Sequence, residues 1–157
     1  MLCPSIGITS ITFDTGDRGD VIINNTSLPS TLRGGCGSDV IEGGSAADTL
    51  IGDPAGCPQA GNDSLDGRQG PDAIAGGPGG DTLTGGDGND RISGGPGQDQ
   101  VDGGAGSDRI GTDDGVPDTV RCGAGFDSVR HDATDSVASD CEQVVASPPP
   151  RVVDPSG

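Results

Sequence analysis

The sequence predicts an all-β solenoid, a fold in which short strands and tight turns repeat along one axis. Three observations predict it: a nine-residue motif recurs without a gap over residues 67–111, glycine and aspartate dominate the composition, and apolar residues are scarce. The 157 residues include 31 glycines and 12 prolines, and only 29% are hydrophobic. Apolar burial alone is therefore too small to account for folding.

The repeat consists of units that place aspartate sixth and an aliphatic residue eighth. Five consecutive units read GRQGPDAIA, GGPGGDTLT, GGDGNDRIS, GGPGQDQVD and GGAGSDRIG. Two earlier units in the same register are GGCGSDVIE, from Gly34, and GGSAADTLI, from Gly43. The unit between Ile51 and Gly67 carries six extra residues but still ends in the sequence DSLD. A fixed period of this kind is the signature of a repeat architecture.

The pattern decays toward both ends. Upstream, Asp20 begins a good match, whereas Ser30 stands at the acidic place of its unit. Downstream, Asp118, Asp127 and Asp135 follow at spacings of ten, nine and eight residues. Atypical terminal repeats are expected at the ends of a solenoid.

The paired glycines and the aspartates of the turns indicate a cation site. Glycine tolerates positive φ and the close backbone approach of a turn whose carbonyls converge on a ligand. Calcium takes six to eight oxygen ligands and accepts both carbonyls and carboxylates. Equivalent turns in a parallel stack recur at about 4.8 Å, the spacing of neighbouring strands. Two carboxylates at that distance repel by roughly 1 kcal/mol in water and by more in a less polar setting. Stacked aspartates therefore need cations between them.

These units resemble the calcium-binding nonapeptide repeats of the RTX (haemolysin-type) family, G-G-x-G-x-D-x-U-x, over roughly residues 15 to 137. The resemblance implies a parallel β-roll in which each x-U-x triplet is a strand, each G-G-x-G-x-D segment is a turn, and two units form one coil. It also implies calcium ions between stacked turns, bound by aspartate carboxylates and main-chain carbonyls.

If two units form one coil, alternate units share an edge of the roll. The expected aspartate ligands on one edge are Asp39, Asp63, Asp81, Asp99 and Asp118. Those on the other edge are Asp48, Asp72, Asp90, Asp108 and Asp127. The expected glycine ligands lie in the central turns: Gly76, Gly77, Gly79, Gly85, Gly86, Gly88, Gly94, Gly95, Gly97, Gly103, Gly104 and Gly106. Roughly four to eight calcium ions are expected, since each needs several oxygens.

Disulfides are expected rather than a zinc site, because the five cysteines include no C-x-x-C pair and the chain has only one histidine. The two-unit coil pairs Cys36 with Cys57 and Cys122 with Cys141, and it leaves Cys3 free. Stacked turns allow the roughly 5.5 Å Cα separation that a disulfide prefers. RTX proteins exported in one step are typically poor in cysteine, so this chain is expected to leave the cell through an oxidising pathway.

The expected organisation is an N-terminal cap or fragment end at 1–14, a calcium-binding β-roll at 15–145 and a proline-rich disordered tail at 146–157. His131 is expected to be a solvated turn residue. With a net charge of −17 and a sequence pI near 4.1, nucleic acid is not expected as a partner. Membrane insertion is not expected either, because no apolar run approaches the roughly 18 residues of a spanning helix.

The function predicted from these observations is calcium binding outside the cell, with a structural or secretion-linked role and folding coupled to the metal. An enzyme is not expected, because the sequence has no H-E-x-x-H, G-x-S-x-G or P-loop motif. The alternative is the C-terminal repeat module of a larger secreted hydrolase or adhesin. A flexible acidic linker would not place an aliphatic residue at the eighth place of each nine-residue unit. Ice binding would require Thr-x-Thr ladders, and Thr82-Leu83-Thr84 is the one such triplet in the repeats.

Overall fold

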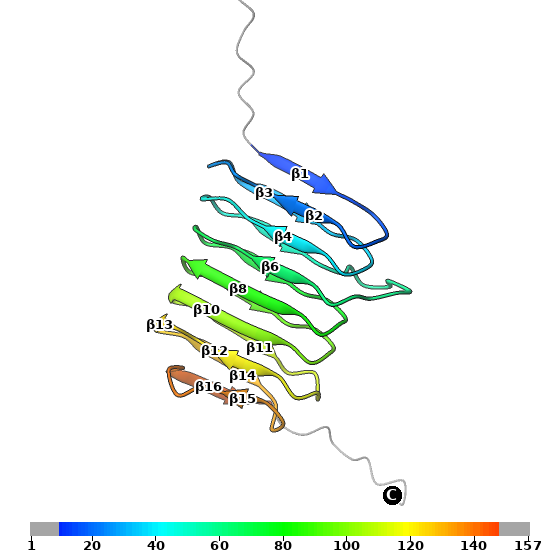
Figure 1. Ribbon diagram of the computed structural model, residues 1–157. Coiled ribbons are helices and arrows are strands. Elements are labelled where there is room, and N and C mark those ends of the chain that lie inside the picture. The colour runs from blue at the N-terminus through cyan, green and yellow to red at the C-terminus, as the bar shows by residue number, and fades with distance from the viewer. Residues whose placement is uncertain (1–9, 148–157) are drawn as a thin grey trace, which may run out of the picture.

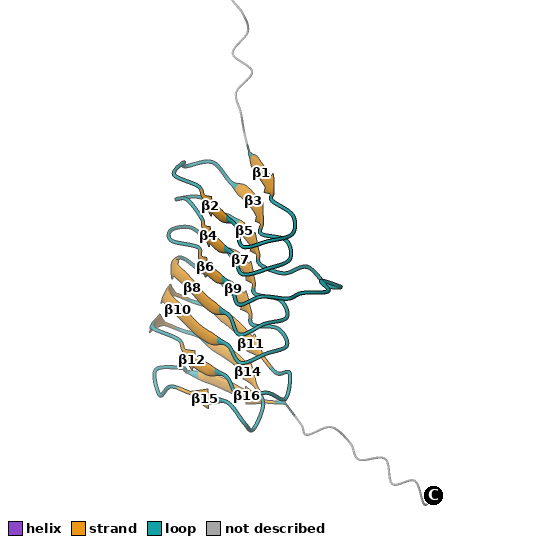
Figure 2. Ribbon diagram, turned by 45° about the vertical axis from the view of Figure 1, so that its right-hand side comes forward, coloured by secondary structure: helices purple, strands orange, loops and turns teal. Residues whose placement is uncertain are grey.

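The computed structural model describes residues 10–147, and every regular element in that range is a β-strand. The strands form a stack of coils, and each coil contributes one strand to each of two parallel sheets (Figures 1 and 2). The prediction of an all-β parallel roll is therefore confirmed. The described residues include no helix that is long and apolar enough to span a membrane.

The two sheets alternate along the chain. The first contains β1 (Ile11–Asp14), β3 (Ser30–Arg33), β5 (Thr49–Ile51), β7 (Ala73–Ala75), β9 (Arg91–Ser93), β11 (Arg109–Thr112), β14 (Ser128–His131) and β16 (Gln143–Ala146). The second contains β2 (Val21–Ile23), β4 (Val40–Glu42), β6 (Ser64–Asp66), β8 (Thr82–Asp87), β10 (Gln100–Gly106), β12 (Thr119–Arg121) and β15 (Ser136–Val137). The short strand β13 (Ala124–Gly125) pairs with β10.

The core lies between the two sheets and consists of one aliphatic residue from each of the strands β2 to β12 and β14. The register aligns Leu83 with Val101 in the second sheet and Ile74 with Ile92 in the first. Because neighbouring side chains on a strand point to opposite faces, the residue at the eighth place points inward and its two neighbours point outward. The buried aliphatic residues are Ile22, Leu32, Ile41, Leu50, Leu65, Ile74, Leu83, Ile92, Val101, Ile110, Val120 and Val129. The eighth place of the repeat is thus the core position.

Two details differ from the sequence-based expectation. Strands β8 and β10 extend beyond the x-U-x triplet into the turns, because main-chain pairing continues there and aligns Gly86 with Gly104. His131 is the last residue of β14 and is half-buried, rather than being a solvated turn residue. Its partner in the register is Thr112, so parallel pairing with β11 extends the strand to this position.

Both predicted disulfides are present. Cys36 is bonded to Cys57 with a Cα separation of 5.5 Å, and Cys122 is bonded to Cys141 with a Cα separation of 5.2 Å. Cys57 lies in the insertion after β5, which projects from the stack beside β6 (Figure 1). Cys3 lies outside the described residues, as do residues 148–157 of the expected tail.

Candidate metal-binding turns

The ten predicted aspartates form two rows along the stack, one on each edge of the roll. Each aspartate directly precedes a strand, so the strand register brings equivalent aspartates together. We call the aspartates before the second sheet the first row; they are Asp39, Asp63, Asp81, Asp99 and Asp118. We call those before the first sheet the second row; they are Asp48, Asp72, Asp90, Asp108 and Asp127.

Hydrogen bonds connect the aspartates within each row. The backbone N–H of an aspartate donates to Oδ1 of the next aspartate in its row, over N to O distances of 2.7–2.9 Å. For example, Asp81 donates to Asp99, and Asp90 donates to Asp108. One carboxylate oxygen of each residue after the first in a row therefore holds adjacent coils together. The two rows contain the same aspartates that the sequence analysis assigns to the two edges of the roll.

The second carboxylate oxygen, Oδ2, remains without a hydrogen-bond partner in most of these residues. Nine of the ten have a buried Oδ2 that no group in the described part of the chain contacts as a donor. The exception is Asp48, whose Oδ2 accepts from the backbone N–H of Gly44 at 2.6 Å. An ionised carboxylate that is buried without a partner is strongly unfavourable. Unpartnered oxygens of this kind fit a bound cation.

Burial of the carboxylates changes their acidity. Desolvation raises the pKa of Asp63, Asp72 and Asp99 to about 7, and backbone hydrogen bonds offset only part of that increase. Nearby carboxylates in or beside the rows raise these pKa values further. Desolvation also raises the pKa of Asp81, Asp108 and Asp118 to about 6, and it raises the pKa of Asp39 and Asp90. These side chains favour either a proton or a positive ion.

The predicted glycines surround the aspartates in two structural roles. The second and fourth glycines of the central turns have φ between +98° and +152°, which side chains rarely tolerate. They are Gly77, Gly79, Gly86, Gly88, Gly95, Gly97, Gly104 and Gly106. The first glycines are Gly76, Gly85, Gly94 and Gly103, and they face the Oδ2 atoms. A Cβ at Gly76 would lie 2.3 Å from Oδ2 of Asp81, so a side chain there would fill the space beside the free oxygen.

The first glycines also use their carbonyls in the main-chain ladder. The carbonyl oxygen of Gly94 accepts from the N–H of Gly77 at 3.0 Å, and that of Gly76 accepts from Asp53 at 2.9 Å. Since a carbonyl oxygen has two lone pairs, one remains for a cation. All the candidate metal-ligand atoms in these turns are oxygens, which suit calcium better than a softer metal.

The cysteines provide no metal ligands at either place where they lie beside an aspartate. Cys36 and Cys57 approach Asp53, and Cys122 and Cys141 approach Asp140. Each cysteine pair is a disulfide, and a metal-binding cysteine is a thiolate. Neither cluster therefore offers a cysteine thiolate to a metal ion.

Asp53 is a buried carboxylate that the repeat pattern did not identify. It is the second residue of the unit that carries the insertion, where most other units have glycine. Its Oδ1 accepts from the N–H of Gly37 at 3.3 Å, and its Oδ2 accepts from that of Gly61 at 2.7 Å. Its charge raises the pKa of Asp39 and Asp63. Only the six extra residues of this unit signalled that its turn would differ.

The rows also continue into positions omitted from the predicted ligands. In the first row, Asp20 donates its N–H to Oδ1 of Asp39, and Asp118 donates to Oδ1 of Asp135 at 3.1 Å. In the second row, Asp127 donates to Oε2 of Glu142 at 2.8 Å. A glutamate thus replaces the aspartate at the C-terminal end of the second row. The change of residue type and the irregular spacing concealed this position in the sequence.

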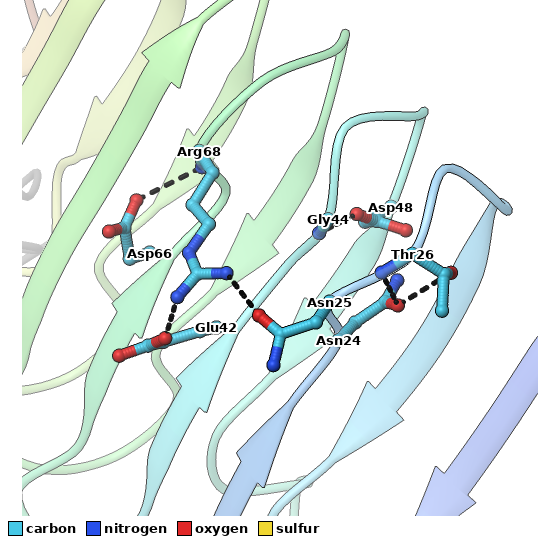
Figure 3. A network of polar contacts seen from close by, with 8 residues as sticks. All are labelled: Asn24, Asn25, Thr26, Glu42, Gly44, Asp48, Asp66 and Arg68. Carbon is cyan, nitrogen blue, oxygen red and sulfur yellow. Dashed lines mark hydrogen bonds and ion pairs between the residues drawn. The ribbon is translucent and has the colours of Figure 1, made fainter.

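A polar network replaces the glycine turn at one end of the second row (Figure 3). Arg68 stands where most units have glycine, and it adopts a φ of +71°. Its side chain forms an ion pair with Glu42 of the neighbouring coil and donates to Oδ1 of Asn25 at 3.2 Å. Its backbone N–H donates to Asp66 at 3.0 Å. Arg68 therefore links three coils through its side chain and offsets the strain of its backbone.

Comparison with known proteins agrees with this arrangement. The family model described as the RTX calcium-binding nonapeptide repeat matches four copies, over residues 30–54, 59–74 and 75–110. No curated protein and no solved structure matches the chain at a significant level. The matched residues contain nine-residue units whose aspartates belong to both rows, together with their core positions. The chain belongs to the family of proteins with RTX calcium-binding nonapeptide repeats.

Proposed function

We propose that this chain is an extracellular calcium-binding module whose β-roll folds when calcium binds, and that its role is structural or linked to secretion. The observation that carries the proposal is the row of buried carboxylates with unpartnered Oδ2 atoms. Calcium would neutralise them and supply the positive charge that the rows lack. Calcium binding itself is the property of the repeat family.

The proposed ligands are the carboxylates of the two rows together with carbonyl oxygens of the glycine turns. The regular central turns provide the most complete set, because Asp81 and Asp99 in the first row and Asp90 and Asp108 in the second lie in adjacent coils. Each of these four has a buried, unpartnered Oδ2. We therefore expect the strongest sites in the centre of the stack.

Coupling between metal binding and folding follows from the same geometry. Before the chain folds, its aspartates are separate and hydrated. In the folded roll they are buried in rows, and the like charges repel one another. A cation that binds only the folded state stabilises it, so binding free energy becomes folding free energy.

An extracellular location is supported by the disulfides and by the calcium requirement. Two disulfides fit an oxidising compartment. Extracellular calcium modules bind with dissociation constants of about 10⁻⁴–10⁻³ M. With that affinity, the chain would remain unfolded in a calcium-poor cytosol and fold after export.

Calcium titration followed by far-ultraviolet circular dichroism tests this proposal, with magnesium as the matched control. Calcium should produce a β-sheet spectrum, whereas magnesium at the same concentration should not. Magnesium demands a small octahedral site and loses its water reluctantly. Equal ordering by both ions, or a full β-sheet spectrum after chelation and disulfide reduction, would contradict the proposal.

A further inference from the structure

The outward faces of the two sheets carry different charges. On the first sheet, the residues that flank the core positions from β3 to β14 include four arginines and no acidic residue. They are Thr31, Arg33, Thr49, Ile51, Ala73, Ala75, Arg91, Ser93, Arg109, Gly111, Ser128 and Arg130. The corresponding residues of the second sheet, from β4 to β12, include three acids and one arginine. In a chain with a net charge of −17, this acid-free face is an exception.

Three of these arginines surround a hollow on the first sheet. The register places Arg91 beside Arg109 on one side of the core column, and Ser93 beside Gly111 on the other. In the next coil, Arg130 lies beside Gly111. Gly111 has no side chain, and a Cβ placed there would meet nothing within 4 Å. Ser128, Ile92 and Ile110 complete the lining of the hollow. The two isoleucine side chains are buried in the core, so the floor is largely main chain and the rim is guanidinium and hydroxyl groups.

Two of the three arginines at the rim of the hollow form no ion pair within the described residues. Arg130 forms an ion pair with Asp113 at 2.9 Å, whereas Arg91 and Arg109 have no acidic partner in the described part of the chain. Like charges directly opposite on neighbouring strands are destabilising. At physiological ionic strength, electrostatic interactions between exposed charges are screened beyond about 8 Å. Asp90 and Asp108 directly precede Arg91 and Arg109, but their carboxylates are buried in the second row, so the groups exposed at the rim are arginines.

We propose that this hollow binds a tetrahedral oxyanion of the sulfate or phosphate type. Guanidinium groups present several N–H donors in a fixed plane and suit such anions. Arg91 and Arg109 would contribute unpaired charge, and Arg130 would approach from the next coil. Ser93 and Ser128 can donate hydroxyl hydrogen bonds. The absence of a side chain at Gly111 leaves room for the anion above the main chain.

Titration with sodium sulfate, followed by ¹⁵N nuclear magnetic resonance, tests the site directly. The chain is first folded in calcium chloride, and the ionic strength is held constant with sodium chloride. We expect saturable shifts of the Gly111 amide and of the Nε–H groups of Arg91 and Arg109. Shifts that are spread over the molecule or that do not saturate would overturn the proposal.

Two variants and one control make the test specific. Arg109→Gln should weaken sulfate binding by about tenfold or more. Arg121→Gln, on the outward face of the second sheet, should leave sulfate affinity unchanged. Gly111→Asp should place a carboxylate among the arginines, abolish the sulfate response and raise Tm by about 1–3 °C. Equal effects of Arg109→Gln and Arg121→Gln, with all variants giving the same circular dichroism spectrum, would overturn the proposal.

A second titration distinguishes the source of the anion. A sulfated oligosaccharide is compared with the same oligosaccharide without sulfate and with inorganic sulfate. Stronger binding of the sulfated oligosaccharide would assign the hollow to an ester group on a polymer, and equal binding would assign it to the free ion. Failure of both sulfate sources to bind the folded chain would overturn this proposal while leaving the proposed calcium binding intact.

Discussion

The central coils and the ends of the stack hold neighbouring turns together by different means. In the centre, from β7 to β11, the turns have nine-residue spacing and stack through buried aspartates. Toward the ends, disulfides join the turns at Cys36–Cys57 and Cys122–Cys141. The central coils therefore depend on charge that must be neutralised, whereas the terminal coils depend partly on covalent bonds.

The turn before β3, near the N-terminal end of the stack, has no carboxylate at the acidic place. Asn24 is 5% exposed, and its Oδ1 accepts from both the N–H and the hydroxyl of Thr26. Its Nδ2 donates to the carbonyl of Leu28 at 3.4 Å. Ser30 stands at the acidic place, so this turn contributes no carboxylate to the second row. Because Asn24 and Ser30 are uncharged, this turn has no carboxylate charge that a cation would need to neutralise.

The largest difference between centre and end is expected from alanine at two positive-φ glycines. Gly97→Ala should prevent folding or cost more than about 4 kcal/mol, because the new Cβ would lie 1.5 Å from the carbonyl oxygen of Gly79. Gly115→Ala should cost only ~1–2 kcal/mol, the cost of its φ of +94°, because its Cβ would meet nothing within 4 Å. Urea unfolding in saturating calcium measures both. Similar losses would show that stacking is equally loose in the two regions.

Removal of the C-terminal disulfide should loosen one end while leaving the centre intact. The double variant Cys122→Ser with Cys141→Ser should lose about 3 kcal/mol, the usual contribution for a loop of this length. Hydrogen exchange in calcium should show faster exchange for the amides of β14 and β16, while amides of β8 and β10 remain protected. Uniformly faster exchange would mean that the disulfide supports the whole roll.

A carboxylate in the centre should matter more for calcium than one at the end. Asp90→Asn should raise the calcium concentration at the folding midpoint about tenfold, equivalent to ~1.4 kcal/mol. Asp90 is 1% exposed and has turns on both sides, and its Oδ2 has no partner. Asp20→Asn should change the midpoint less than about twofold, because Asp20 lies in a terminal coil and is only half-buried. Indistinguishable midpoints would contradict strongest binding in the centre.

The smallest expected effect is that of pH on the calcium-free chain. Six of the row aspartates have pKa values raised to about 6 or 7 in the fold, against 3.8 in their ordinary state: Asp63, Asp72, Asp81, Asp99, Asp108 and Asp118. The folded chain therefore holds more protons than the unfolded chain between those values, and stability falls as pH rises through that window. In chelator, residual β-sheet signal and Tm should be higher at pH 5 than at pH 7.5.

The calcium-loaded chain provides the control for this measurement. Protons compete with calcium for the carboxylates, so with limiting calcium the midpoint concentration should rise at pH 5. The two pH trends therefore have opposite signs. A calcium-free chain whose stability increased from pH 5 to pH 7.5 would show that the buried carboxylates are already stabilised as anions.

The nine-residue period of the sequence by itself determined which residues form the core of this protein. An aliphatic residue at the eighth place is enough to identify the core, because strand residues alternate between faces. Grouping two units per coil, which the family resemblance supplied, placed the aspartates in two rows and paired both disulfides. These features repeat at a constant interval, so a local pattern specifies them many times over.

Only the tertiary structure decided the features that break the period. Asp53 is buried because the insertion folds back against the turn of Gly37, and its length alone does not specify that path. Arg68 takes a glycine position because Glu42, 26 residues earlier, is adjacent in the next coil. The acid-free face around Gly111 likewise depends on which side chains meet across three strands. Each of these contacts joins residues far apart in the chain and occurs only once, so the repeat pattern of the sequence does not predict it.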